Sequence, residues 1–179
     1  MHPLVELAGS AVKNYVSNGT EIAVPFDFPQ EFIDKKAGVF VTIEKDKKLR
    51  GCIGTYLPCY KNIAEETIRN AVIAATEDDR FGPIAKEELP RLNFTVYILS
   101  EPELAPDVKE LDPKKYGIIL KSFDEKKVGL LLPDLKGVDT VFDQICIAAD
   151  KAGIKRSKEP KTIFDELITI YKFTAEKYQ

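Results

Sequence analysis

Histidine is nearly absent from the sequence, and this absence removes several common catalytic arrangements. His2 is the only histidine among the 179 residues, and it lies at the start of the chain. A cysteine–histidine or serine–histidine pair would need His2 to be carried into the site. An iron site built on several histidines is not possible with this inventory. The sequence therefore points away from the catalytic classes that depend on histidine.

Cysteine is also scarce, and its spacing is uninformative. The three cysteines, Cys52, Cys59 and Cys146, form an odd number with no repeated spacing. A disulfide framework is therefore not indicated. Cys52 and Cys59 lack the second Cys/His pair that a structural zinc site needs. We interpret Cys59 and Cys146 as structural and predict no metal site.

The chain also lacks a basic excess and long hydrophobic runs. Its formal net charge is −3 and its pI is about 5.4, whereas nucleic-acid-binding proteins are typically basic. No apolar run approaches the length of a membrane span or resembles a signal peptide. No phosphate-binding loop, dinucleotide fingerprint or zinc-protease motif is present. We expect a cytoplasmic protein that has no cofactor and does not bind nucleic acid or membranes.

The residues that are present have the composition of an ordinary globular domain. Hydrophobic residues make up 44% of the chain and charged residues 31%. Periodicity, caps and turn residues predict a series of helices and strands. These are a helix over 3–19, a Pro- and Phe-rich ordered loop over 21–36, a hairpin over 38–56, a helix from Asn62 to about 77, a strand over 92–99, a second hairpin over 117–132, a helix capped by Asp139, and a final strand over 167–175.

The second half of the chain repeats the order of the first. Gly38 and Gly117, Gly51 and Gly129, and Asn62 and Asp139 are separated by roughly equal offsets of about 78 residues. We predict a single α+β domain of 1–179, made of an N-terminal helix and two halves of about 20–100 and 115–179. Each half is a hairpin, a helix and a strand, and the two halves share one largely antiparallel sheet covered by helices.

The stretch 49–56, Leu-Arg-Gly-Cys-Ile-Gly-Thr-Tyr, is where the two halves differ most. Strand alternation places Arg50 and Cys52 on one face, about 7 Å apart. A neighbouring cation favours the thiolate, so Cys52 is a candidate nucleophile or redox group. Its alternative is a small buried hydrophobic residue. Gly51 and Gly54 leave room for a ligand to approach the backbone.

Arg50 and several residues further along the chain complete the candidate site. Arg50 could bind an anion through two hydrogen bonds, or could form an ion pair with Asp79 or another acid. Glu88 could act as a general base, or could be a surface residue of a short helix. The remaining candidates for binding each have a structural alternative as a core amide or a turn-stabilising group. They are Asn70, Asp79, Arg80 and Phe81.

These residues carry a resemblance to a known family. The hexapeptide Leu49–Gly54, the later Asp79-Arg80-Phe81 and Glu87-Glu88-Leu89-Pro90, and Gly129-Leu130-Leu131-Leu132-Pro133 resemble the AMMECR domain family. Its microbial members are called AmmeMemoRadiSam system protein A. The resemblance implies an α+β domain whose biochemical activity is not settled. It also implies a Memo-like protein and a radical-SAM protein as possible partners.

Two classes of function remain open from the sequence. In one, the domain binds a partner or a small molecule in a cleft beside the Arg50–Gly54 strand. In the other, it is an enzyme that depends on Cys52. The absence of a second clear acid–base group slightly favours the binding module.

Overall fold

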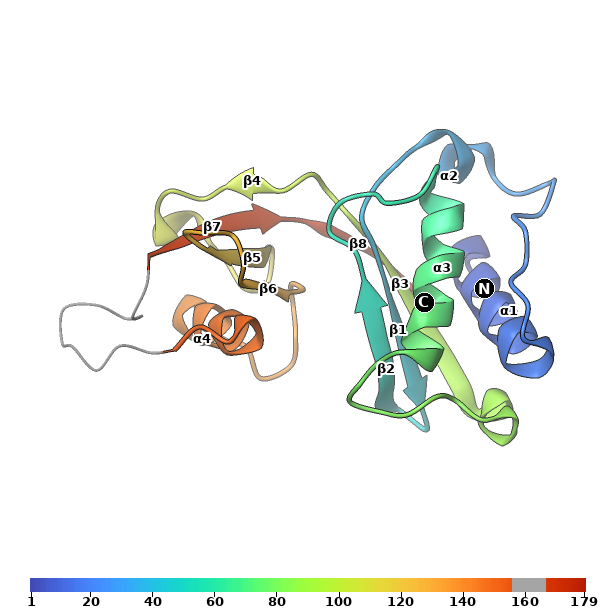
Figure 1. Ribbon diagram of the computed structural model, residues 1–179. Coiled ribbons are helices and arrows are strands. Elements are labelled where there is room, and N and C mark those ends of the chain that lie inside the picture. Colours follow the sequence, from blue (N-terminus) through green and yellow to red (C-terminus); the bar gives the residue numbers. More distant parts are fainter. Residues whose placement is uncertain (156–166) are drawn as a thin grey trace. The chain divides into compact units, whose positions relative to one another are not determined.

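The computed structural model describes residues 1–155 and 167–179, and it divides them into two compact units (Figure 1). Unit 1 consists of Met1–Glu101 and Glu176–Gln179, and unit 2 consists of Pro102–Ala175. Both units combine helices with antiparallel strands, which confirms the α+β class. No helix within the described residues is long and apolar enough to cross a membrane.

Unit 1 is a four-stranded sheet with two long helices on one face. Its strands lie in the order β2-β1-β3-β8, and β1 pairs antiparallel with both β2 and β3. The elements are α1 (Pro3–Asn18), α2 (Gln30–Asp34), β1 (Val39–Lys45), β2 (Lys48–Gly54), α3 (Ile63–Thr76), the 3-10 helix η1 (Lys86–Arg91), β3 (Leu92–Leu99) and β8 (Ala175–Tyr178).

Local signals in the sequence explain where these elements begin and end. Asn62 caps α3 by accepting a hydrogen bond of 2.8 Å from the Glu65 amide. Gly19 ends α1 in the left-handed conformation, with a φ of 71°. Asp46 and Lys47, with φ of 51° and 64°, form the two-residue turn between β1 and β2. The lone histidine, His2, caps the start of α1 and stacks on Tyr178.

The core of unit 1 lies between α1, α3 and one face of the sheet. Val39, Val41 and Ile43 of β1 are fully buried, as are Ala8 and Ala11 of α1 and Ala71 of α3. These β1 residues alternate with half-buried ones, as expected for a strand with one face on a core. The opposite face carries Phe40 and Thr42.

The described part of unit 2 repeats this plan, with one α-helix on its sheet. Its strands lie in the order β4-β7-β5-β6, and α4 packs on β5 and β6 through a core that includes Ile118, Leu120 and Ala148. The elements are β4 (Glu103–Leu104), the 3-10 helix η2 (Val108–Glu110), β5 (Gly117–Ser122), β6 (Val128–Leu131), α4 (Val141–Ala152) and β7 (Ile168–Phe173).

The predicted hairpin–helix–strand order is present in both units. In unit 1 the sequence β1-β2-α3-β3 gives a sheet order of β2-β1-β3, and in unit 2 β5-β6-α4-β7 gives β6-β5-β7. The connectivity of the two units is therefore alike. An origin by duplication stays a prediction.

Three details of the sequence-based prediction are corrected. The two halves do not share one sheet, because the strands of residues 1–155 and 167–179 form two separate sheets of four. The predicted final strand over 167–175 corresponds to β7, and the prediction did not include the strand that follows, β8, which belongs to the other sheet. The cap of α4 is Thr140 rather than Asp139, because the Thr140 hydroxyl accepts from the Asp143 amide. Thr140 is 78 residues after Asn62, which makes the offset more regular.

The predicted loop over 21–36 contains one short helix, α2. Phe32 is buried on the core and Phe28 is half-buried, as expected for a loop that lies on the core. Phe26, by contrast, is fully exposed.

Candidate functional site

The strand that carries the hexapeptide, β2, lies at the edge of its sheet and contains a β-bulge at Arg50. Ile43 pairs with Gly51 and Glu44 pairs with Leu49, so Arg50 has no residue opposite it in β1. A bulge interrupts alternation and redirects the extra side chain. The strict alternation that placed Arg50 beside Cys52 therefore does not extend through Arg50.

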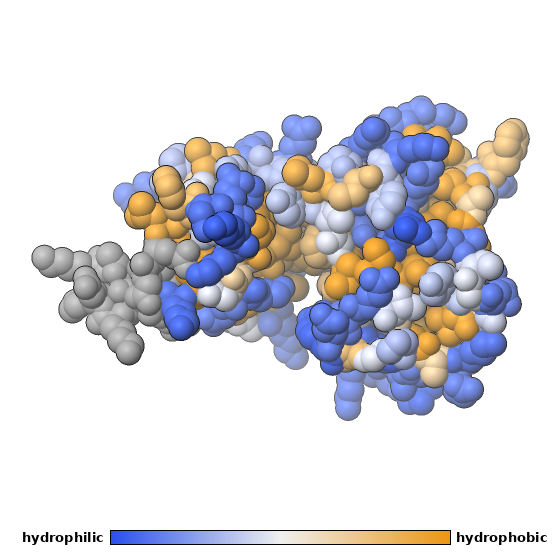
Figure 2. Space-filling view, in the orientation of Figure 1, coloured by the Kyte–Doolittle hydropathy of each residue, from blue (hydrophilic) through white to orange (hydrophobic). Residues whose placement is uncertain are grey.

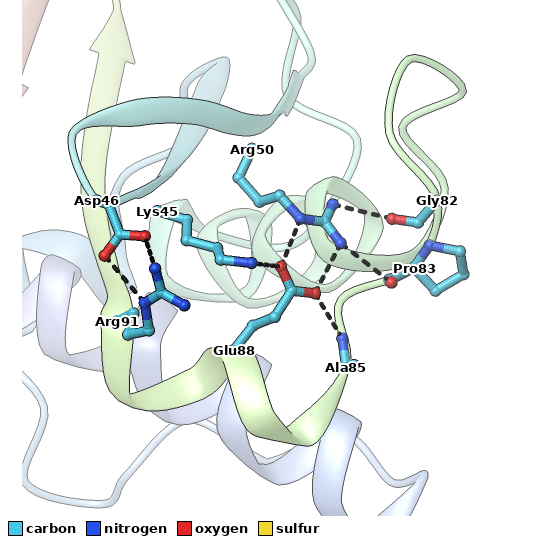
Figure 3. Close-up of polar contacts among 8 residues, drawn as sticks. All are labelled: Lys45, Asp46, Arg50, Gly82, Pro83, Ala85, Glu88 and Arg91. Carbon is cyan, nitrogen blue, oxygen red and sulfur yellow. Dashed lines mark hydrogen bonds and ion pairs between the residues drawn. The ribbon is translucent and has the colours of Figure 1, made fainter.

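The redirected Arg50 side chain is held by the segment that follows α3 (Figure 3). Its Nε and Nη2 donate to the two carboxylate oxygens of Glu88, each at 2.9 Å. Its Nη1 and Nη2 also donate to the carbonyls of Gly82 and Pro83, at 2.9 and 3.1 Å. The fork geometry of arginine is thus used within the protein. Arg50 forms an ion pair, as one interpretation held, but with Glu88 and not with Asp79.

The Glu88 carboxylate accepts hydrogen bonds from two further groups besides Arg50. Its carboxylate also accepts from Lys45 Nζ at 2.8 Å and from the Ala85 amide at 3.0 Å (Figure 3). Hydrogen bonds from Arg50, Lys45 and Ala85 hold the pKa of Glu88 far below its usual range. An efficient general base needs a pKa near the working pH. This geometry does not equip Glu88 for proton transfer.

A second ion pair covers the open edge of β2 at Cys52. The buried carboxylate of Asp78 accepts from the Cys52 amide at 2.8 Å and from Arg80 Nε and Nη2 at 2.9 and 2.7 Å. Arg80 Nη2 also donates to the Cys52 carbonyl at 3.3 Å. Together the two side chains bind both outward-facing backbone groups of Cys52. An edge strand whose polar groups are occupied in this way cannot pair with another strand there.

The interaction between Asp78 and Arg80 favours the charged form of both side chains. The hydrogen bonds with Arg80 lower the pKa of Asp78 to about 2, although burial opposes this effect. The hydrogen bond with Asp78 raises the pKa of Arg80, although burial opposes this effect, and an electrostatic interaction with Cys52 acts in the same direction as Asp78. The cation that bears on Cys52 is therefore Arg80 rather than Arg50.

The sequence identified the neighbouring acid instead of the one that forms the pair. Asp79 is exposed and has no hydrogen bond or ion pair among the described residues. Asp78 and Asp79 follow the helix in succession, and only their burial separates them. Phe81 is half-buried, and its ring lies 5.3 Å from the Arg80 guanidinium carbon.

Both glycines of the hexapeptide lie against other parts of the chain. A Cβ at Gly51 would lie 2.2 Å from the Ala74 carbonyl oxygen of α3. A Cβ at Gly54 would lie 2.3 Å from the Phe40 ring and 2.4 Å from the Val39 carbonyl oxygen. The close approach inferred at these positions is made by the protein's own strand and helix.

Cys52 lies on the face of the sheet opposite α3 and is half-buried. Its Sγ lies 3.2 Å from the Thr42 hydroxyl across the hairpin. A hydroxyl is not a base that could take the thiol proton. The lone histidine is committed to the start of α1. Among the described residues, no group of three His, Cys, Asp or Glu side chains is placed to hold a metal ion.

The sequence did not identify Glu66, which is fully buried at the other end of β2. Its carboxylate accepts from the Thr55 hydroxyl, at 2.5 Å, and from the amides of Cys59 and Tyr60, at 2.8 Å each. Asn70, one turn further along α3, donates to the Val39 carbonyl at 2.9 Å. Asn70 is thus a core amide with a structural partner. The sequence did contain a signal for Glu66, because it is a charged residue on the apolar side of α3.

Comparisons with known proteins agree on one family. The family model described as AMMECR1 matches residues 5–178. A protein of Thermotoga maritima is 46% identical over 179 residues, covering 99% of this chain and 98% of the relative. A crystal structure of an uncharacterized protein from Pyrococcus horikoshii is similar with a TM-score of 0.86 and 34% identity. The structural match covers 97% of this chain and 88% of the Pyrococcus horikoshii chain.

A third relative is much longer than this chain. A protein of Clostridium acetobutylicum is 46% identical over 171 residues, which are 95% of this chain but 36% of the relative. In that protein, the region similar to this chain is joined to a larger remainder.

Proposed function

This chain belongs to the AMMECR1 family, and we propose a function for it from its own geometry. We propose that it is a binding module, which contacts a partner protein or a small anionic ligand through the surface around Arg80 at the β2 edge. Cys52 contributes its backbone to this surface, and its thiol is not a nucleophile.

The observation that carries this proposal is the way Arg80 is presented. About half of its side chain is exposed, while the side chain of Asp78 beneath it is 4% exposed. The Asp78 carboxylate and the Cys52 carbonyl fix Nε and Nη2. Nη1 has no hydrogen bond among the described residues and remains available. A cation that is already positioned loses little conformational freedom when it binds a carboxylate or phosphate.

The state of the other candidates supports binding over catalysis. Arg50 and Glu88 neutralise each other, and the pKa of Glu88 is too low for acid–base work. The Cys52 thiol contacts the Thr42 hydroxyl, which is not a base, and the lone histidine lies at the start of α1. What the cluster does provide is a rigid support for β2.

The partners in this proposal are a Memo-like protein and a radical-SAM protein, which the family resemblance suggests. The clostridial relative supports a role beside other polypeptide, because the similar region there is part of a longer chain. This chain lacks the cysteine triplet of a radical-SAM cluster, so any radical chemistry would belong to the partner.

The experiment is co-purification of this chain with tagged Memo-like and radical-SAM proteins. We expect a complex with wild type and a loss of at least about tenfold in affinity with Arg80→Gln, as is usual for a central charged contact. Arg91→Gln is the matched control, because Arg91 also forms an exposed ion pair, with Asp46, away from this surface. Equal melting temperatures would show that the variants are folded.

Two results would contradict the proposal. One is a complex that Arg80→Gln leaves unchanged. The other is turnover of a small substrate by the isolated chain that is abolished in Cys52→Ser. The second result would favour the cysteine-dependent enzyme.

A further inference from the structure

A second surface of unit 1, away from β2, has features of a peptide-binding groove. The segment 21–24, between α1 and α2, runs beside these helices without forming a helix or strand of its own (Figure 1). Together with Tyr60, Glu65, Ile68 and Arg69 it lines a groove of about 510 Å³. Figure 2 shows hydrophobic residues at the surface over α1 and α3, among hydrophilic ones.

The segment has the side-chain pattern of a strand. Glu21 and Ala23 are exposed, whereas Ile22 and Val24 are half-buried and pack on the core of unit 1. A period of two is typical of extended chain. The two inward side chains therefore fix the segment to the protein.

The backbone of this segment is unpaired. No amide or carbonyl of Ile22, Ala23 or Val24 forms a hydrogen bond with another described residue. Nearly all backbone groups in folded proteins find a partner, and exposed ones use water. A row of free amides and carbonyls along an extended segment is complementary to one kind of surface, another extended chain.

The charge of the groove indicates the character of that chain. Arg69 is the only basic residue in the lining, and it is already paired with Glu21. Glu65 is half-buried, and its side chain has no partner among the described residues. Ile22 also lines a neighbouring hollow of about 400 Å³ that contains Glu6 and Asp27. Glu6 lies 3.9 Å from the N-terminal amine, which leaves Glu65 and Asp27 as the carboxylates without an ion pair among the described residues. These two carboxylates favour a basic occupant.

We propose that segment 21–24 is a free strand that pairs with an extended basic segment of a partner protein, laid in the groove beside α3. Main-chain hydrogen bonds to the amide and carbonyl of Ala23 would supply the pairing, because successive residues of a strand direct these groups to opposite edges. Lysine or arginine side chains of the partner would contact Glu65 and Asp27. This surface is separate from the one around Arg80, and the inference does not depend on the function proposed there.

The test uses the full chain and fluorescent eight-residue peptides. The first peptide alternates lysine and valine, the second alternates glutamate and valine, and the third is the first with alternate amides methylated. We expect the lysine peptide to bind at least about tenfold tighter than either of the others, because charge and backbone bonds both contribute. Amide NMR shifts should be largest at residues 22–24.

Two pairs of variants locate the effect. Glu65→Gln should weaken binding of the lysine peptide by about three- to tenfold, which is the usual range for the net effect of one ordinary hydrogen bond. Glu87→Gln, at an exposed acid of η1, should leave it unchanged. Ala23→Pro removes an amide that has no internal acceptor, so the protein should stay folded and lose most of its affinity. The control is Ala23→Ser, which changes the same side chain and keeps the amide. Ala85→Pro cannot serve as a control, because the Ala85 amide donates a hydrogen bond to Glu88.

The outcomes are decisive in both directions. Equal binding of the lysine and glutamate peptides, or of the methylated peptide, would overturn the inference. So would shifts that fall outside residues 21–29 and α3. If sedimentation shows a dimer of this chain that Ala23→Pro dissociates, the occupant is a second copy, and the inference of a basic partner is wrong.

Discussion

Removing the charge of Asp78 should destabilise unit 1 and change how its stability depends on pH. Asp78→Asn keeps the shape of the side chain and can still accept the Cys52 amide. It loses the ion pair with Arg80, however, and its amide group would face Arg80 donors. The pKa of Asp78 falls from 3.8 to about 2 in the folded protein. A difference of that size corresponds to roughly 2 kcal/mol of stability at neutral pH.

The sign of the pH effect follows from the direction of the shift. The folded protein binds the Asp78 proton less tightly than the unfolded chain does. The contribution is therefore fully present above about pH 4 and is lost as the pH falls toward 2. The wild type should lose its advantage over Asp78→Asn across this window. Glu88 also has a lowered pKa, but it is present in both proteins and cancels in the difference.

The assay is urea unfolding followed by circular dichroism at a series of pH values from 7 to 2.5. If the two units unfold in separate transitions, the one that responds belongs to unit 1. Asp79→Asn is the matched control, because Asp79 is adjacent, exposed and unpaired among the described residues. Its effect should stay within about 0.5 kcal/mol. A wild-type advantage that is absent at pH 7, or that does not shrink at low pH, would refute the reasoning.

Three further predictions follow from the site. Iodoacetamide should label exposed Cys59 first, half-buried Cys52 more slowly and buried Cys146 last, as read by mass spectrometry. Faster labelling of Cys52 would restore its role as a reactive thiol. Gly51→Ala should lower stability by about 1–3 kcal/mol in urea unfolding, because its Cβ would meet the α3 backbone; a neutral effect would contradict this packing. Glu66→Gln should cost about 1–3 kcal/mol and speed the labelling of Cys59, whose amide it holds; unchanged labelling would show that the loop does not depend on Glu66.

The order of the elements could be predicted from the sequence because its signals are local. Asn62, Gly19 and the polar turn at Asp46 and Lys47 act within a few residues of themselves. The separate strand β8 was not predicted, because β7 and β8 form an almost continuous extended run. Only pairing with β5 and with β3 shows that the two parts enter different sheets.

The sequence predicted several residues of the candidate site but not which of them form pairs. Arg50, Arg80 and Glu88 were all selected from the sequence, and all three take part in ion pairs. The bulge at Arg50 depends on the register against β1, which alternation alone does not reveal. The choice of Asp78 over Asp79 depends on which side chain turns inward after α3 ends.

The two units show which features of the hexapeptide belong to the scaffold. A Cβ at Gly129 would lie 1.9 Å from the Ala148 carbonyl oxygen of α4, as one at Gly51 would approach α3. In unit 2, Lys151 Nζ donates to the Leu130 carbonyl at 3.0 Å, as Arg80 does to the equivalent Cys52 carbonyl. A glycine beneath the helix and a cation on the edge strand are therefore common to both units. At the position of Cys52, unit 2 has Leu130, so the thiol on the edge strand is a difference between the two units among the described residues. Arg80 differs from Lys151 in that the buried Asp78 carboxylate fixes its guanidinium, and the Asp78 and Arg80 variants test this pair directly.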